Sequence, residues 1–183
     1  MNTFEAINSR KSTRRYTTQP VEKEKLEQIV SAGNKAAIAG SLDFAVITNA
    51  AILDMIQKTA KAVMLKSGND FLMMRANTPG FEVLYNAPAA IAVITEATNN
   101  PQSAGMNNAN AGCAAQNMLL AATALNVSSC YTASSCLAFA VPDVKKAIGI
   151  SEDKAVACIV ALGYSEDDTP VRSRSDKNIK WCE

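Results

Sequence analysis

The spacing of apolar residues divides the chain into helices separated by short apolar runs. Apolar positions recur at helical intervals and predict four helices, over residues 3–10, 21–33, 51–67 and 107–125. Thr3 is expected to cap the first helix and Gly33 to end the second. Pro142 is placed to begin a further helix that runs to about residue 148. Residues 69–80 show no decisive pattern and are expected to form a loop or a frayed helix.

Four apolar runs between these helices have the length and composition of strands. They cover residues 44–48, 89–95, 127–132 and 155–162. Residues 89–95 (AAIAVIT) are apolar without alternation, which is typical of a strand buried on both faces. Helices at the ends of the chain and between the strands indicate an α+β sandwich in which helices cover a sheet. We expect one domain over residues 1–183.

The stretch from residue 97 to residue 142 contains no charged side chain. Asparagine and glutamine interrupt it, and its continuous apolar runs are shorter than a bilayer requires. It therefore predicts a central helix buried on nearly every side rather than a membrane segment. Asn107, Asn108 and Asn110 are expected to cap this helix. So large an apolar surface on a small domain also predicts an obligate homodimer.

Charge and residue usage exclude several functions. Basic and acidic side chains number 18 and 17, so no global charge attracts nucleic acid or an anionic membrane. The chain has no histidine, which excludes Ser-His-Asp triads and histidine-rich zinc sites, and we expect no metal. Five cysteines without a C-x-x-C pair are typical of reduced thiols in a cytoplasmic protein. Most are expected to be packing residues, although Cys130 and Cys136 are also candidates for a redox pair.

Two short basic segments are candidates for binding an anion. In an extended chain Arg10, Ser12 and Arg14 share one face and present two guanidinium groups around a hydroxyl. Arg172 and Arg174 repeat the alternation near the other end. The two segments are either solvated surface loops or two arms that converge on one small dianion. The glycines form no dinucleotide or P-loop motif, so the anion expected here is a monophosphate held by side chains.

Ordered segments of the chain resemble the nitroreductase family. The resemblance rests on INSRKSTRRY near the start, NAPAAIAVI, the central NAGCAAQNMLLAATALNVSSCY, and LGY followed by PVRSR. It implies a nitroreductase-like sandwich with a central, mostly antiparallel sheet flanked by helices. It also implies an FMN cofactor bound between the subunits of a homodimer, with the central helix in the interface.

The resemblance assigns the phosphate contacts of FMN by position. Arg10, Ser12 and Arg14 would bind the phosphate, and Lys11 would add backbone or ring-edge contacts. The late basic pair would close over the same phosphate through Arg172 or Arg174.

The resemblance also assigns the contacts of the flavin ring. A backbone N–H near Ala133 and Ser134 would face the flavin N5. The family segment A-P-S-x-x-N-x-Q-P-W, which contacts the ring, is shortened here to residues 36–44 (AAIAGSLDF) and lacks the usual Asn and Gln.

The expected activity follows from the cofactor, because the flavin supplies the redox chemistry and no catalytic side chain is required. NAD(P)H would reduce FMN, and a small acceptor such as a nitroaromatic or a quinone would then be reduced in a ping-pong mechanism. One alternative is a protein that binds or stores FMN, or a specialised flavoenzyme with another electron donor. Another is a flavin-free interaction module that uses the basic segment as a patch.

Overall fold

The computed structural model describes the chain except residues 168, 173–178 and 183. Its centre is a four-stranded sheet in the order β1-β2-β4-β3, with every neighbouring pair antiparallel. The strands are β1 (Asp43–Ile47), β2 (Ala89–Glu96), β3 (Ser128–Thr132) and β4 (Lys154–Gly163). The α+β class, with a mainly antiparallel sheet flanked by helices, is therefore confirmed.

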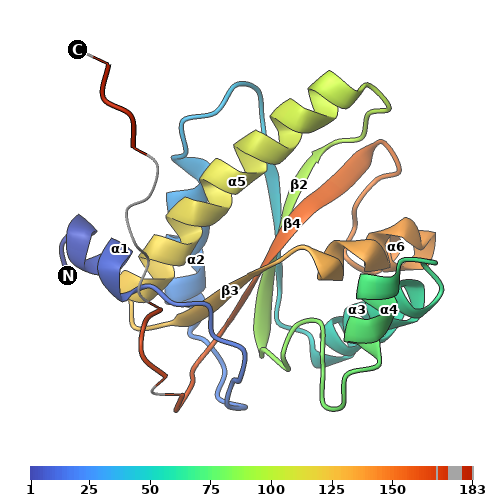
Figure 1. Ribbon diagram of the computed structural model, residues 1–183, viewed down its shortest axis with the longest axis horizontal. Coiled ribbons are helices and arrows are strands. Elements are labelled where there is room, and N and C mark those ends of the chain that lie inside the picture. The colour runs from blue at the N-terminus through green and yellow to red at the C-terminus, as the bar shows by residue number, and fades with distance from the viewer. Residues whose placement is uncertain (168, 173–178, 183) are drawn as a thin grey trace.

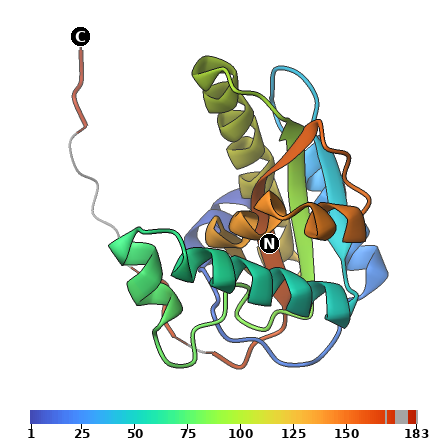
Figure 2. The same ribbon diagram turned by 90° about the vertical axis from the view of Figure 1, so that its right-hand side faces the viewer.

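Helices cover both faces of this sheet, as Figure 1 shows. They are α1 (Thr3–Ser9), α2 (Lys23–Asn34), α3 (Ala50–Leu65), α4 (Asp70–Ala76), α5 (Pro101–Ala124), the 3₁₀ helix η1 (Ser134–Ala140) and α6 (Pro142–Ala147). The helices α1, α2 and α5 lie on one side of the sheet. The helices α3, α4 and α6 lie on the other side, where Figure 2 shows α3 crossing in front of the strands.

Strand β2 joins the two halves of the core. Ala89, Ile91 and Val93 face the layer of α2 and α5, whereas the alternate residues, among them Ala92 and Ile94, face the layer of α3 and η1. All of these side chains are buried. The expectation of a strand buried on both faces is confirmed, because a strand between two helical layers has no solvent face.

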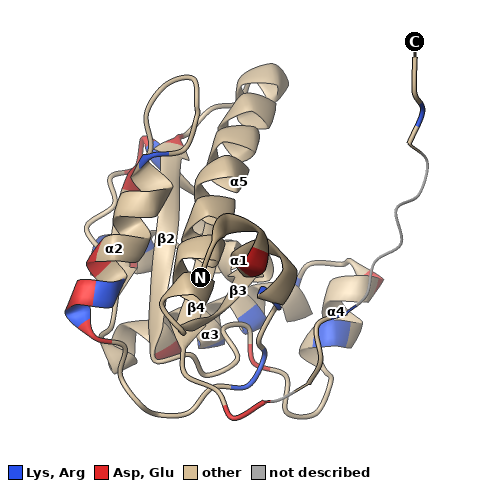
Figure 3. Cartoon of the chain, turned by 90° about the vertical axis from the view of Figure 1, so that its left-hand side faces the viewer, with Lys and Arg blue, Asp and Glu red and all other residues tan. Residues whose placement is uncertain are grey.

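The central helix α5 begins six residues earlier than expected. It runs over 24 residues from Pro101, and Asn100 caps it by accepting hydrogen bonds from the N–H groups of Gln102 and Ser103. In the single chain only one face of α5 is buried, and the opposite face, which includes Met106 and Cys113, is exposed. The helix carries no charged residue, unlike α2 beside it (Figure 3). Within the described part of the chain, no helix is long and apolar enough to cross a bilayer.

The first helix is capped by Asn2 rather than by Thr3. The Asn2 side chain accepts a hydrogen bond from the Glu5 N–H at 3.0 Å, and the Glu5 carboxylate accepts one from the Asn2 N–H at 2.8 Å. This reciprocal pair satisfies two backbone donors, whereas a Thr3 cap would satisfy one. Asn69 likewise caps α4, in the region for which no element was predicted.

Gly33 lies inside α2 instead of ending it. A Cβ atom at Gly33 would lie 2.2 Å from Met118 Cε and 2.9 Å from Met118 Cγ on α5. The absence of a side chain therefore lets α2 and α5 approach closely, and the glycine has a packing role rather than a capping one.

We expect Gly33→Val to lower the free energy of unfolding by about 2–3 kcal/mol, because it overpacks the contact with Met118. In a Met118→Ala background the same substitution should cost much less, since the methionine side chain no longer occupies the space. Chemical denaturation of the four variants measures this coupling. Equal costs in both backgrounds would contradict the packing role.

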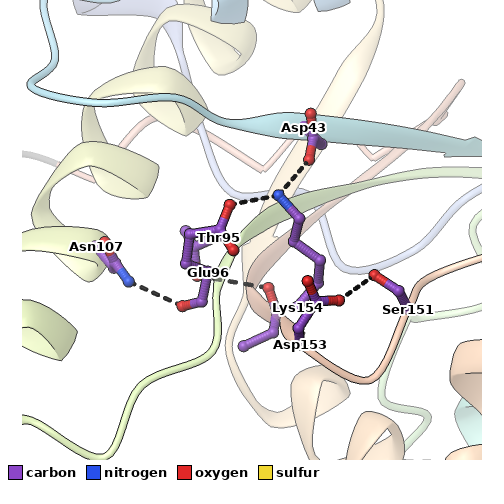
Figure 4. Close-up of polar contacts among 8 residues, drawn as sticks. Asp43, Thr95, Glu96, Asn107, Ser151, Asp153 and Lys154 are labelled. Carbon is purple, nitrogen blue, oxygen red and sulfur yellow. Dashed lines mark hydrogen bonds and ion pairs between the residues drawn. The ribbon is translucent and has the colours of Figure 1, made fainter.

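One end of the sheet is joined by an ion-pair network centred on Lys154 of β4 (Figure 4). The Lys154 ammonium lies 3.0 Å from the Asp43 carboxylate of β1 and 2.5 Å from the Glu96 carboxylate of β2. The hydrogen bonds that Lys154 donates to the carboxylates of Glu96 and Asp43 raise its pKa. Asn107 of α5 donates to the Glu96 carbonyl at 2.9 Å. The network links three strands and α5 at the end of the sheet where β1 begins.

Candidate functional site

The Arg10–Arg14 segment extends the sheet at the free edge of β3. Arg10 ends α1, and Ser12 then forms a parallel bridge with Ser129 of β3. The Thr13 N–H donates to the Ser129 carbonyl at 3.0 Å, and the Thr13 side chain is buried. The segment is thus extended, as the alternation of its side chains predicted.

Arg10, Ser12 and Arg14 alternate along this segment, and alternation in an extended chain places their side chains on one side. Ser12 and Arg14 are exposed and Arg10 is partly exposed, whereas Thr13 is buried. Burial raises the pKa of the Cys130 thiol of β3, and the positive charges of Arg14 and Arg10 oppose this rise.

A further cation on this side, Arg75 of α4, was not predicted. Its Nη2 donates to the Tyr85 hydroxyl at 3.2 Å, and its guanidinium lies 4.6 Å from the centre of the Phe81 ring. The Arg14 guanidinium lies 6.0 Å from the centre of the Tyr85 ring, so Tyr85 stands between the two arginines. Sequence reasoning missed Arg75, because residues 69–80 were expected to form a loop or a frayed helix and no local pattern links them to the basic segment.

The cations of this cluster are free of carboxylate partners within the described ranges. Every ion pair found there involves lysine, and none involves Arg10, Arg14 or Arg75. Guanidinium groups that are not neutralised internally attract an external anion and can bind phosphate oxygens in pairs.

Ala133 and Ser134 lie where β3 ends and η1 begins. Ser135 is fully buried, and its hydroxyl donates to the Thr132 carbonyl at 3.0 Å. The Thr132 and Ser135 hydroxyls also bond each other at 2.7 Å. These contacts fix the turn, and the Cys136 N–H donates to the Ala133 carbonyl at 3.1 Å. The N–H groups of Ser134 and Ser135, which come before this first bond, point out of the start of the helix.

The C-terminal segment runs beside the N-terminal basic segment. The Thr17 N–H donates to the Tyr164 carbonyl at 2.8 Å, and the Ser165 hydroxyl donates to the Arg15 carbonyl at 2.6 Å. Residues 15–17 and residues 164–165 therefore lie side by side. Arg172 follows this contact and is exposed, whereas Arg174 lies outside the described residues.

Lys11 points away from the arginines and binds backbone carbonyls. Its ammonium donates to the carbonyl of Asp167 at 2.6 Å and to that of Thr169 at 2.7 Å. Lys11 also lines a small cavity of about 280 Å³, together with Thr13, Ser129 and other polar residues. A separate groove of about 980 Å³ lies between α2 and β1, and none of the predicted site residues lines it.

Asn110 of α5 holds the shortened loop between α2 and β1. Its side-chain amide donates to the Ala39 carbonyl at 2.6 Å and accepts from the Ala39 N–H at 3.4 Å. None of Asn107, Asn108 and Asn110 caps α5, and the expectation that they do was wrong, because the helix starts at Pro101 and Asn100 caps it. Asn110 instead lies inside the helix and fixes the loop that the family resemblance places near the flavin ring.

We expect Asn110→Ala to lower the free energy of unfolding by about 1–2 kcal/mol, because two hydrogen bonds are lost and Ala39 is exposed enough to be rehydrated. Amide exchange of residues 36–42 should accelerate more than that of the sheet. Asn108→Ala, at an exposed position of the same helix, is the control. Unchanged exchange in the loop would contradict the role of Asn110.

The cysteines behave as thiols rather than as a redox pair in this structure. Cys130 and Cys136 are both free. Burial raises the pKa of Cys136 to about 12 and also raises that of Cys130. Little thiolate is present at neutral pH, and the thiolate is the reactive form. Cys113 and Cys182 are exposed, so the expectation that most cysteines are buried fails for these two in the single chain.

Comparison with known proteins identifies the family. The model of the nitroreductase family matches residues 7–164. An FMN-bound nitroreductase from Bacteroides fragilis NCTC 9343 is 26% identical, with a TM-score of 0.85 and full coverage of both chains. An FMN-bound nitroreductase from Desulfitobacterium hafniense DCB-2 is 23% identical, with the same TM-score and coverage. No curated protein sequence is significantly similar to the chain.

The family match covers most of the chain and includes the Arg10–Arg14 segment, the central helix and all four strands. The chain belongs to the nitroreductase family. The family and the fold that the sequence motifs indicated are thereby confirmed.

Proposed function

We propose that the protein is an FMN-dependent oxidoreductase that passes reducing equivalents from NAD(P)H to a small acceptor, such as a nitroaromatic or a quinone, in a ping-pong mechanism. The observation that carries the proposal is the cluster of Arg10, Ser12 and Arg14 at the edge of β3. Arg75 adds a further positive charge. The cluster fits a phosphate dianion, because its guanidinium groups have no carboxylate partners in the described ranges.

The distance along β3 also fits a molecule with a phosphate at one end and a ring at the other. Ala133, at the start of η1, comes four positions after Ser129, which pairs with the basic segment. A strand rises ~3.3 Å per residue, so the two ends are about 13 Å apart. Backbone N–H groups at Ala133 and Ser134 would orient the ring edge by donating hydrogen bonds.

When bound, FMN would accept a hydride equivalent from NAD(P)H and release it to the acceptor. The protein's part is to bind and orient. Arg10, Arg14 and Ser12 would hold the phosphate, and Arg172 or Arg174 would close over it. The loop fixed by Asn110 would shape the space beside the ring.

The descriptions of similar structures support the proposed cofactor and electron donor. The proteins from Bacteroides fragilis and Desulfitobacterium hafniense contain FMN. A protein from Clostridium acetobutylicum with the same fold is described as a putative NADH oxidase; it is 23% identical, with a TM-score of 0.65, and the match covers 93% of this chain and 94% of that one. A nicotinamide donor is therefore proposed here as well.

The shortened loop over residues 36–44 favours a second candidate, a protein that binds or stores FMN or a flavoenzyme that uses another donor. The loop lacks the Asn and Gln of the family segment. Under either candidate we propose a homodimer in the cytoplasm, and the free thiols are compatible with a reducing compartment.

Steady-state kinetics distinguish the two candidates. With NADH or NADPH varied at several fixed concentrations of a quinone, a ping-pong oxidoreductase should give parallel double-reciprocal lines. Intersecting lines would contradict the ping-pong mechanism. Turnover with an artificial electron donor but with neither nicotinamide would support the second candidate.

A further inference from the structure

Lys11 connects the two ends of the chain at the basic cluster. It lies between Arg10 and Ser12, and its ammonium binds the carbonyls of Asp167 and Thr169 at 2.6 and 2.7 Å. Successive side chains of this extended segment therefore point to opposite sides and have different contacts. Arg10 and Ser12 alternate with Lys11 and share the opposite side of the extended segment, whereas Lys11 reaches the C-terminal segment.

Hydrogen bonds within residues 165–169 hold the two carbonyls in place. The Asp167 carboxylate accepts hydrogen bonds from the N–H of Thr169 at 3.0 Å and from its hydroxyl. These bonds lower the pKa of Asp167 and keep it charged at neutral pH. The Asp167 N–H donates to the Ser165 hydroxyl at 3.1 Å, which in turn donates to the Arg15 carbonyl. The turn is thus braced internally and attached to the N-terminal segment.

The chain reaches Arg172 three residues after the Lys11 contact. Pro170 comes directly after Thr169 and has a restricted φ angle, and it also restricts Thr169 to extended conformations. The path of the chain after Thr169 therefore depends on where Thr169 is held. Because Lys11 holds the Thr169 carbonyl, it also limits where Arg172 can lie.

We propose that Lys11 is a positioning residue that holds residues 167 and 169 beside the Arg10–Arg14 segment, so that Arg172, three residues after Thr169, can bind the same FMN phosphate as Arg10 and Arg14. The inference rests on the proposed function. It gives Lys11 a role through backbone carbonyls rather than a direct contact with the flavin ring. Without the ammonium, the carbonyls of Asp167 and Thr169 lose their hydrogen-bond donor. The segment that leads to Arg172 is then no longer held beside the Arg10–Arg14 segment.

The test compares FMN with riboflavin, which has the same ring but no phosphate. Lys11→Met removes the ammonium and keeps much of the side-chain length. We expect this variant to bind FMN about 10-fold to 100-fold more weakly, since part of a charge-assisted phosphate contact is lost. Riboflavin affinity should stay within about twofold, because no phosphate is involved. Quenching of flavin fluorescence on binding to the flavin-free protein measures both affinities.

Lys145→Met is the matched control. The Lys145 ammonium also donates to two backbone carbonyls, those of Lys154 at 2.7 Å and Glu152 at 3.4 Å, but away from the basic cluster. This variant should leave the ratio of FMN to riboflavin affinity unchanged. Lys11→Arg, which keeps donors and charge, should restore much of the FMN affinity.

A second measurement tests whether Lys11 affects FMN binding through the C-terminal segment. In an Arg172→Gln background, Lys11→Met should weaken FMN binding no further, because the side chain whose position depends on Lys11 no longer carries a charge. In the flavin-free protein, Lys11→Met should accelerate amide exchange over residues 164–172.

Three results would overturn the inference: unchanged FMN affinity in Lys11→Met, equal losses for FMN and riboflavin, or full additivity with the arginine substitution. A wild-type protein that binds no FMN would overturn the proposed function itself, and the positioning role with it.

Discussion

Replacing Arg10 and Arg14 together by alanine is expected to weaken FMN binding by about two to four orders of magnitude. A hydrogen bond to a charged group contributes about 1.5–3 kcal/mol, and two such contacts to the phosphate would be lost. The loss should be seen for FMN and not for riboflavin, because the two arginines face the proposed phosphate position rather than the ring. Equilibrium titration of the flavin-free variant with each flavin measures the two affinities.

Arg15→Ala provides the control within the same segment. Arg15 is exposed and follows Arg14, and its backbone carbonyl, which accepts from the Ser165 hydroxyl, is retained in the variant. FMN affinity should therefore change little. Wild-type FMN affinity in the Arg10→Ala/Arg14→Ala variant would remove the phosphate assignment and leave the solvated-loop interpretation of the basic segment.

Introducing a charge on the exposed face of α5 is expected to convert the proposed homodimer into monomers at micromolar concentration. Ala109 is exposed in the single chain, on the face that also carries Met106 and Cys113. Phe4 and Ile7 of α1 add exposed apolar surface, and α1 contacts α5. In Ala109→Glu the carboxylate would be buried without a partner in each subunit, which costs several kcal/mol.

Ala62→Glu is the matched control, because Ala62 is an exposed alanine of another helix, α3. Light scattering of wild type and both variants over a range of concentrations measures the oligomeric state. Wild type and Ala62→Glu should be dimers, and Ala109→Glu a monomer that has lost FMN. A wild-type monomer loaded with FMN would contradict the proposed interface.

The sheet and most helices could be predicted from sequence because their signals are local. Continuous apolar runs marked β2 and β4, and helical spacing marked α2 and α3. Capping and length depend on contacts that composition does not show. Asn2 competes with Thr3 for the same helix end through a reciprocal bond with Glu5, and Gly33 is explained only by the nearness of Met118 on another helix.

The candidate site was predictable only in part, for the same reason. Alternation placed Arg10, Ser12 and Arg14 on one side, because it follows from extended backbone geometry. The role of Lys11 depends on a segment more than 150 residues away in sequence. Arg75 lies near Arg14 because both contact Tyr85, and it belongs to α4, in a region that was expected to form either a loop or a frayed helix. Asn110 looked like a cap but holds a loop 71 residues away. Long-range contacts of this kind have no local signature.

The central claim is that FMN bound to this protein accepts electrons from NADH or NADPH. The most direct test is the visible absorption of the purified protein under anaerobic conditions, before and after addition of each nucleotide. The purified protein should be yellow, and its flavin absorption should be bleached by at least one nucleotide and restored by a quinone. A colourless protein that does not take up FMN, or a yellow one that neither nucleotide bleaches, would contradict it.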